Sequence, residues 1–235
     1  NFTNIIFYNI ALIVNRNYYR YMHLKYIINK NYLIVSIFLG LILHLISAYC
    51  SIGFYSDDEH FQILEIAGYL LGINEIAIED TTGHYWEWRE HVRMRPWFQP
   101  YLFYKFINFL QFIGINDSFS WALYLRIFSS LIGFVSIIIL YFTFRNYFFQ
   151  KYLKLNTFIF FSFWFYPFLH SRTSSENLGI SLFIISFCLL FNLIITEKFK
   201  FNYLLLIFSS FTMGLSLVIK FTLVFSAVPF FLWLV

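Results

Sequence analysis

The sequence predicts an all-α polytopic membrane protein, and three observations support this fold class. Of its 235 residues 60% are hydrophobic and only 12% are charged, and the mean hydropathy is +0.68. Soluble domains carry about 25% charged residues, so this composition excludes a soluble domain. Apolar runs of membrane-crossing length recur along the chain, and cations gather where these runs end. The chain starts without Met and stops inside an apolar run, which we interpret as a fragment of a longer protein.

Residues 1–31 are expected to form a basic cytoplasmic segment. Its cations appear with no acid among them, and they are Arg16, Arg20, Lys25 and Lys30. By the positive-inside rule such a segment stays in the cytoplasm. The apolar residues 32–54 are long enough to cross a hydrocarbon core of about 30 Å. The loop 55–119 that follows therefore faces away from the cytoplasm, and it is the expected catalytic loop within the membrane domain, residues 32–235.

The remaining elements follow from charge as much as from hydropathy. Residues 97–115 and 120–144 are both apolar, but if both crossed the membrane, Arg145, Lys151 and Lys154 would lie outside. We therefore expect residues 97–115 to form an amphipathic helix along the outer interface. The chain then crosses inward at 120–144, outward at 157–169, inward at 178–195, outward at 203–219 and inward at 221–235. An outer turn is expected at 170–177.

The outer loop holds most of the acid of the chain, since nine of the twelve acidic residues lie between positions 57 and 90. Charge beside a bilayer is expensive, so such a cluster marks a site. Asp57 is placed to cap a helix that begins with Asp58 and Glu59, where the helix dipole favours acid. Asp58, Gln62 and Glu65 then share one face of this helix.

The same pattern predicts where this short helix ends and what its other face contacts. Phe61, Leu64 and Leu71 are expected to settle on the membrane, and Gly72 is a suitable residue to end the helix.

A second polar segment follows, in which a carboxylate lies between two tryptophans. An interfacial aromatic belt explains Trp86 and Trp88 but not Glu87 between them. Planar cations that suit phosphate or carboxylate come next, at Arg89, Arg93 and Arg95. The outer turn adds Arg172, and Lys220 adds a cation at the outer end of a later segment.

A carboxylate pair beside cations at a membrane mouth suits glycosyl transfer. A carboxylate can take the proton of an acceptor hydroxyl, and cations can stabilise a departing phosphate. We assign Asp58 as general base, supported by Glu59. The predicted substrate-binding residues are Asp57, Gln62, Glu65, Trp86, Glu87, Trp88, Arg89, Arg93, Arg95, Arg172 and Lys220. No metal is assigned, although His60 and His84 leave a divalent cation as an alternative without a recognised ligand spacing.

Several of these segments resemble one known family. The sequence SDDEHFQILE at 56–65 is similar to the acidic motif of Alg9-like mannosyltransferases, glycosyltransferase family 22 of the GT-C superfamily. Residues 85–88, YWEW, followed by Arg95 and Pro96, resemble that family's TWEW segment. Residues 171–173 resemble its SRT turn, and 220–222 stand where relatives often carry Arg-Pro-Thr. The likeness covers about 33–235, the amino-terminal half of such an enzyme.

The resemblance implies an inverting hexosyltransferase with a GT-C bundle. Its donor would be a polyprenyl- or dolichyl-phosphate-linked mannose and its acceptor a glycan or glycolipid. The base would be Asp58, but Asp57 replaces the family's usual Pro, which leaves the choice between Asp57 and Asp58 open. The location would be a bacterial inner membrane with a periplasmic site, or the endoplasmic reticulum membrane with a lumenal one.

Three other functions stay open at this point. A transporter or flippase would carry its acids in an outer vestibule, but transporters place ionisable residues near the membrane midplane. A GT-C enzyme with another lipid-linked sugar and a degenerate structural subunit are the other two. Nucleic acid is not an expected partner, because the net charge of +4 comes from clusters beside apolar runs.

Overall fold

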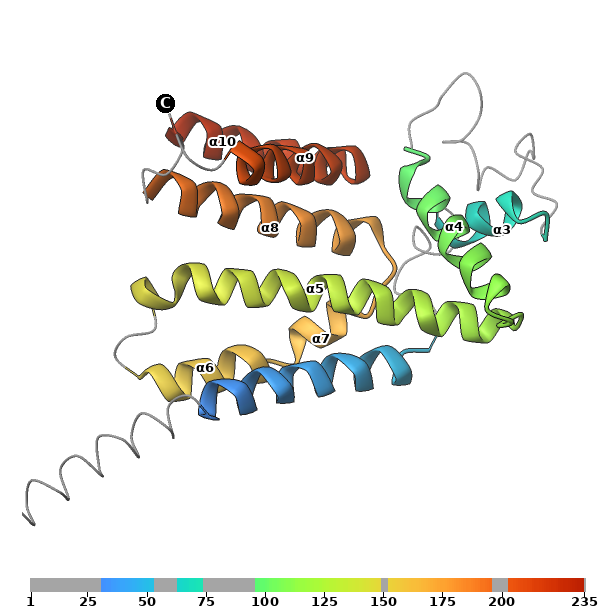
Figure 1. Ribbon diagram of the computed structural model, residues 1–235, viewed down its shortest axis with the longest axis horizontal. Helices are drawn as coiled ribbons and strands as arrows, with labels where there is room; N and C mark the ends of the chain where they lie inside the picture. The colour runs from blue at the N-terminus through green and yellow to red at the C-terminus, as the bar shows by residue number, and fades with distance from the viewer. Residues whose placement is uncertain (1–30, 53–62, 74–95, 149–151, 196–202, 235) are drawn as a thin grey trace, which may run out of the picture.

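The computed structural model describes residues 31–52, 63–73, 96–148, 152–195 and 203–234, and within these ranges it contains helices and no strand. The first helix, Asn31–Cys50, carries no label in Figure 1. The helices that follow it are α3 (Glu65–Leu70), α4 (Phe98–Phe112), α5 (Ser118–Phe148), α6 (Leu153–Ser162), α7 (Phe165–His170), α8 (Ser175–Ile195), α9 (Tyr203–Ile219), η4 (Phe221–Leu223) and α10 (Val224–Leu234).

Three of the described helices are long and apolar enough to cross a membrane: Asn31–Cys50, Ser118–Arg145 within α5, and α8. Shorter apolar helices span Tyr203–Ile219 and Phe221–Leu232. The long helices lie alongside one another, and the first helix runs opposite to α5 and α8, between which α6 and α7 return the chain (Figure 1). The all-α polytopic fold class is therefore confirmed.

The α3 and α4 helices gather at one end of this bundle, which we call the α4 end (Figure 1). The turn between α7 and α8 lies toward the same end, whereas α5 ends and α6 begins at the opposite end, where Arg145 and Lys154 lie. The predicted succession of crossings requires this separation. Helix α4 lies across the end of the bundle and not alongside α5, in keeping with an interfacial helix (Figure 1).

Helices α3 and α4 pack on the start of α5 through one apolar cluster. Its buried members are Ile63, Ala67, Phe103, Ile107 and Leu125. Leu64 and Leu71, which we expected on the membrane, pack against this cluster instead. The reason is that α4 offers α3 an apolar face directly. The two helices therefore form one unit anchored to α5.

Both helices of this unit end in the same way. Gly72 and Gly114 follow α3 and α4 with φ of 71° and 95°, a conformation in which glycine carries no steric penalty. The Gly72 N–H donates to the carbonyl of Tyr69, and the Ile73 N–H to that of Gly68. This is the Schellman arrangement, and Gly72 was correctly predicted as the stop.

Two segment boundaries differ from the prediction. The outward segment expected at 157–169 is broken into α6 and α7, because Phe163 is extended and Pro167 in the first turn of α7 has no N–H to continue a helix. The outer turn is shorter than expected, since Ser175 already begins α8. Ser174 explains this early start, because its Oγ accepts a hydrogen bond from the Asn177 N–H at 3.3 Å.

Candidate functional site

Three of the predicted site residues lie in the described part of the chain, namely Glu65 on α3, Arg172 in the turn before α8, and Lys220 after α9. The others lie outside it, and they are Asp57, Asp58, Glu59, Gln62, Trp86, Glu87, Trp88, Arg89, Arg93 and Arg95. Their assignments stay predictions. The geometry below concerns the elements that surround them.

The turn that links α7 to α8, residues 171–174, is held from within by one amide. The Asn177 Nδ2 donates to the carbonyl oxygens of His170, at 3.0 Å, and Arg172, at 2.7 Å. Ser171, Thr173, Ser174 and Asn177 are all buried. The asparagine amide therefore donates to two backbone carbonyls that would otherwise lack a hydrogen-bond partner at this chain reversal.

The same turn is held from outside by two other elements. Gln99 of α4 is buried, and its Nε2 donates to the Thr173 carbonyl at 2.9 Å. Ser47, near the end of the first helix, donates from its hydroxyl to that of Ser171 at 3.2 Å. The first helix, α4 and the turn therefore meet at the α4 end of the bundle. The fold thus brings the α3 and α4 unit, which carries Glu65, to the segment that carries Arg172.

Two cations lie on the elements of this site. The guanidinium carbon of Arg172 lies 5.0 Å from the centre of the Phe168 ring. This cation–π contact orients the planar guanidinium group. Lys220, predicted as a candidate phosphate or acceptor contact, forms an ion pair with Glu176 in the first turn of α8. Gly179 allows this pairing, because a Cβ there would lie 3.1 Å from Cβ of Lys220.

A comparison with models of known protein families identifies the family of this chain. The model described as the Alg9-like mannosyltransferase family matches residues 34–235. The chain belongs to that family. It is therefore a glycosyltransferase, and with its apolar helices an integral membrane protein. Comparison with curated proteins found no match, and comparison with solved structures found none.

In this member of the Alg9-like family, sequence reasoning missed an arginine that ties two long helices together. Arg126 of α5 donates from its Nη1 to the carbonyl of Ser51, just beyond the first helix. The signal was present, because a charged residue inside a long apolar segment is costly and marks a function. The interfacial helix 97–115 was predicted, but the bond from its Gln99 to Thr173 was not.

Metal binding by this family member was not predicted, and the described residues contain no group of three side chains suited to hold an ion. His60 and His84, the alternative ligands, lie outside the described ranges. The absence of an assigned metal stays a prediction.

Proposed function

We propose that this family member transfers mannose from a polyprenyl- or dolichyl-phosphate carrier to a glycan or glycolipid acceptor at the outer face of the membrane. The observation that carries the proposal is the bond between Gln99 and Thr173. It fastens the helices that follow the acidic motif to the turn that carries Arg172. Elements that carry Glu65 of the acidic motif and Arg172 thereby meet at one end of the bundle, which supports the proposal.

In the proposed reaction, the acceptor hydroxyl oxygen attacks the anomeric carbon of the sugar. Asp58 takes the hydroxyl proton as the new C–O bond forms, and Glu59 supports it. The bond from the anomeric carbon to the phosphate oxygen breaks, and the lipid phosphate leaves with the electron pair. Attack opposite the leaving group inverts the anomeric configuration.

The leaving phosphate gains negative charge as this bond breaks, so cations act most strongly in the transition state. Arg172 is the proposed contact, because a guanidinium matches phosphate oxygens with two parallel donors. Lys220 and the predicted Arg89, Arg93 and Arg95 are further candidates. The carrier chain stays in lipid, which explains why the site belongs beside the membrane.

The test is transfer of radiolabelled mannose from its polyprenyl-phosphate carrier by membranes that contain the full-length protein. Asp58→Asn should abolish transfer, whereas the matched variant Asp57→Asn should retain it. The reverse result would move the base to Asp57. Transfer of glucose but not mannose from the same carrier would change the sugar. Movement of the intact sugar-bearing carrier across the vesicle membrane, without transfer of its sugar, would favour a flippase.

A further inference from the structure

A pair of buried histidines lies directly beneath the turn 171–174, and the proposed mechanism does not use it. His44 belongs to the first helix and His170 is the last residue of α7, and both are buried. Their rings approach within hydrogen-bond distance, since Nε2 of His44 lies 3.0 Å from Nδ1 of His170. Two imidazoles in an apolar bundle are costly unless each polar nitrogen finds a partner.

The contacts fix which nitrogen carries hydrogen in the uncharged pair. Nδ1 of His44 lies 2.7 Å from the Gly40 carbonyl. Since a carbonyl oxygen only accepts, this nitrogen must donate. Nε2 of His44 is then an acceptor, and Nδ1 of His170 must donate to it. The bonds run in one direction, from His170 through His44 to the backbone of the first helix.

Neighbouring residues of α5 and α7 pack closely around the pair. At position 133 of α5 a Cβ would come within 2.3 Å of Cγ of His170, so only glycine admits the ring. The Tyr166 ring lies nearly parallel to that of His170, with ring planes 14° apart and ring centres 6.1 Å apart. Phe134 lies against His44, with ring centres 4.9 Å apart. The histidine pair is therefore a closely packed contact between the first helix, α5 and α7.

The backbone of His170 connects this contact to the site. Its carbonyl accepts from Asn177, which also holds the Arg172 carbonyl. The neighbouring Ser171 is bonded to Ser47, one turn beyond His44 on the first helix. A shift of the His170 ring would therefore displace the start of the turn and the Arg172 backbone.

We propose that His44 and His170 are positioning residues, whose mutual hydrogen bond sets the place of the turn 171–174 and of Arg172 for sugar transfer. This inference rests on the proposed function for its kinetic effect only. A displacement of about 1 Å in a catalytic group can lower a rate about 100-fold. We expect the loss in kcat, since Arg172 acts on charge that develops in the transition state.

Two variants of similar size and polarity at position 44 separate positioning from simple packing. The end of a glutamine side chain reaches the place of Nε2, so His44→Gln keeps an acceptor for His170. Asparagine reaches only the place of Nδ1, so His44→Asn loses it. In the full-length protein we expect His44→Gln to retain most of the transfer rate. His44→Asn should lower kcat about 10- to 100-fold, with the donor KM changed much less.

A second readout follows the turn itself and needs no sugar transfer. The hydroxyls of Ser47 and Ser171 are 3.2 Å apart, so cysteines at these positions are within reach of a disulfide. With Cys50 and Cys188 replaced by serine, the oxidation rate of the Ser47→Cys, Ser171→Cys pair reports the position of the turn. It should be unchanged by His44→Gln and about tenfold slower with His44→Asn.

Equal crosslinking in the two variants, or equal kcat, would overturn the inference. If the wild type transferred no sugar, the proposed function would fail, but the crosslinking comparison would still decide the positioning role. If His44→Asn did not fold, the other ring provides the same contrast. His170→Asn keeps a donor at the place of Nδ1 and should crosslink normally, whereas His170→Gln should not.

Discussion

Replacing Gly133 by alanine is expected to destabilise the bundle, because the His170 ring occupies the space that the new methyl group needs. A Cβ at this position would lie 2.3 Å from Cγ of His170, 2.6 Å from Cδ2 and 2.7 Å from Cβ. Cβ and Cγ lie on the axis about which the ring rotates, so a rotation of the ring cannot move these two atoms away. The end of α7 has to shift instead.

The size of the effect follows from two opposed terms. Carbon atoms in contact prefer a separation of about 3.5 Å or more, so the ring must retreat by about 1.2 Å (3.5 − 2.3). Overpacking costs about 1 to 3 kcal/mol, and a shift of this size belongs near the upper figure. Alanine recovers about 1 kcal/mol over glycine inside a helix. The net loss expected for Gly133→Ala is therefore about 2 kcal/mol.

The matched control is Gly214→Ala in α9, where a Cβ would meet nothing within 4 Å. Here only the higher helix propensity of alanine contributes, so the free energy of unfolding of this variant should exceed that of the wild type by up to about 1 kcal/mol. The measurement is the free energy of unfolding of each purified variant in one detergent, by chemical denaturation. A Gly133→Ala protein as stable as the Gly214→Ala protein would refute the steric reasoning.

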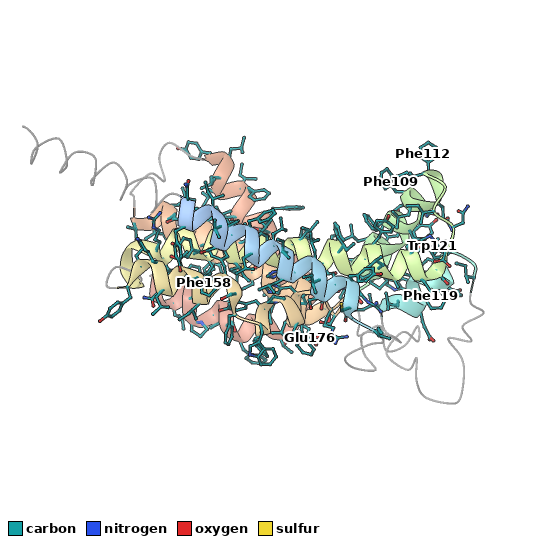
Figure 2. The ribbon with its side chains drawn as sticks, turned by 90° about the horizontal axis from the view of Figure 1, so that it is seen from below. Phe109, Phe112, Phe119, Trp121, Phe158 and Glu176 are labelled. Carbon is teal, nitrogen blue, oxygen red and sulfur yellow. The ribbon has the colours of Figure 1, made fainter. Side chains whose placement is uncertain are left out.

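Three further predictions concern the α4 end. Gln99→Leu removes the buried bond to Thr173 and should cost about 1 kcal/mol in the same denaturation assay; unchanged stability would mean that the bond does not hold α4 in place. For Glu176 and Lys220, whose side chains are 44% and 17% exposed, a double-mutant cycle with glutamine should give a coupling of at most about 1 kcal/mol. A larger coupling would mean that the pair is shielded from solvent. Phe112 is 89% exposed and projects from the end of α4 (Figure 2). In Phe112→Trp, brominated lipids should quench the added fluorescence, and a lack of quenching would place α4 away from the membrane.

The membrane-crossing helices were predictable because each lies in a long, mostly apolar run, and hydropathy reports such runs directly. The break between α6 and α7 was missed for the same reason, since Phe163 and Pro167 do not interrupt the apolar character. The early start of α8 was missed because serine and asparagine are typical of turns. Only the hydrogen bond from Asn177 to Ser174 shows that these residues cap and begin a helix.

The candidate site was predictable in its residue types but not in its connections. Arg172 was predicted as a cation of the polar outer turn, and Lys220 as a cation at the outer end of an apolar segment. The partners of such groups are set by tertiary packing, and the contacts join residues far apart in sequence. Lys220 meets Glu176 across 44 positions, and Gln99 meets Thr173 across 74. No local pattern encodes either pairing.

The length of α5 has a consequence for the membrane in which the protein works. Its 31 residues extend about 46 Å, and its two arginines, Arg126 and Arg145, are 19 positions and so about 29 Å apart. That separation equals the thickness of a typical hydrocarbon core, about 30 Å. With these arginines at the two boundaries, the stretch 118–125 extends into the headgroup region and holds the α3 and α4 unit at the interface. In a thinner bilayer the helix must tilt, whereas in a thicker bilayer the lipid around it must thin, so bilayer thickness tunes how far the unit stands from the membrane surface.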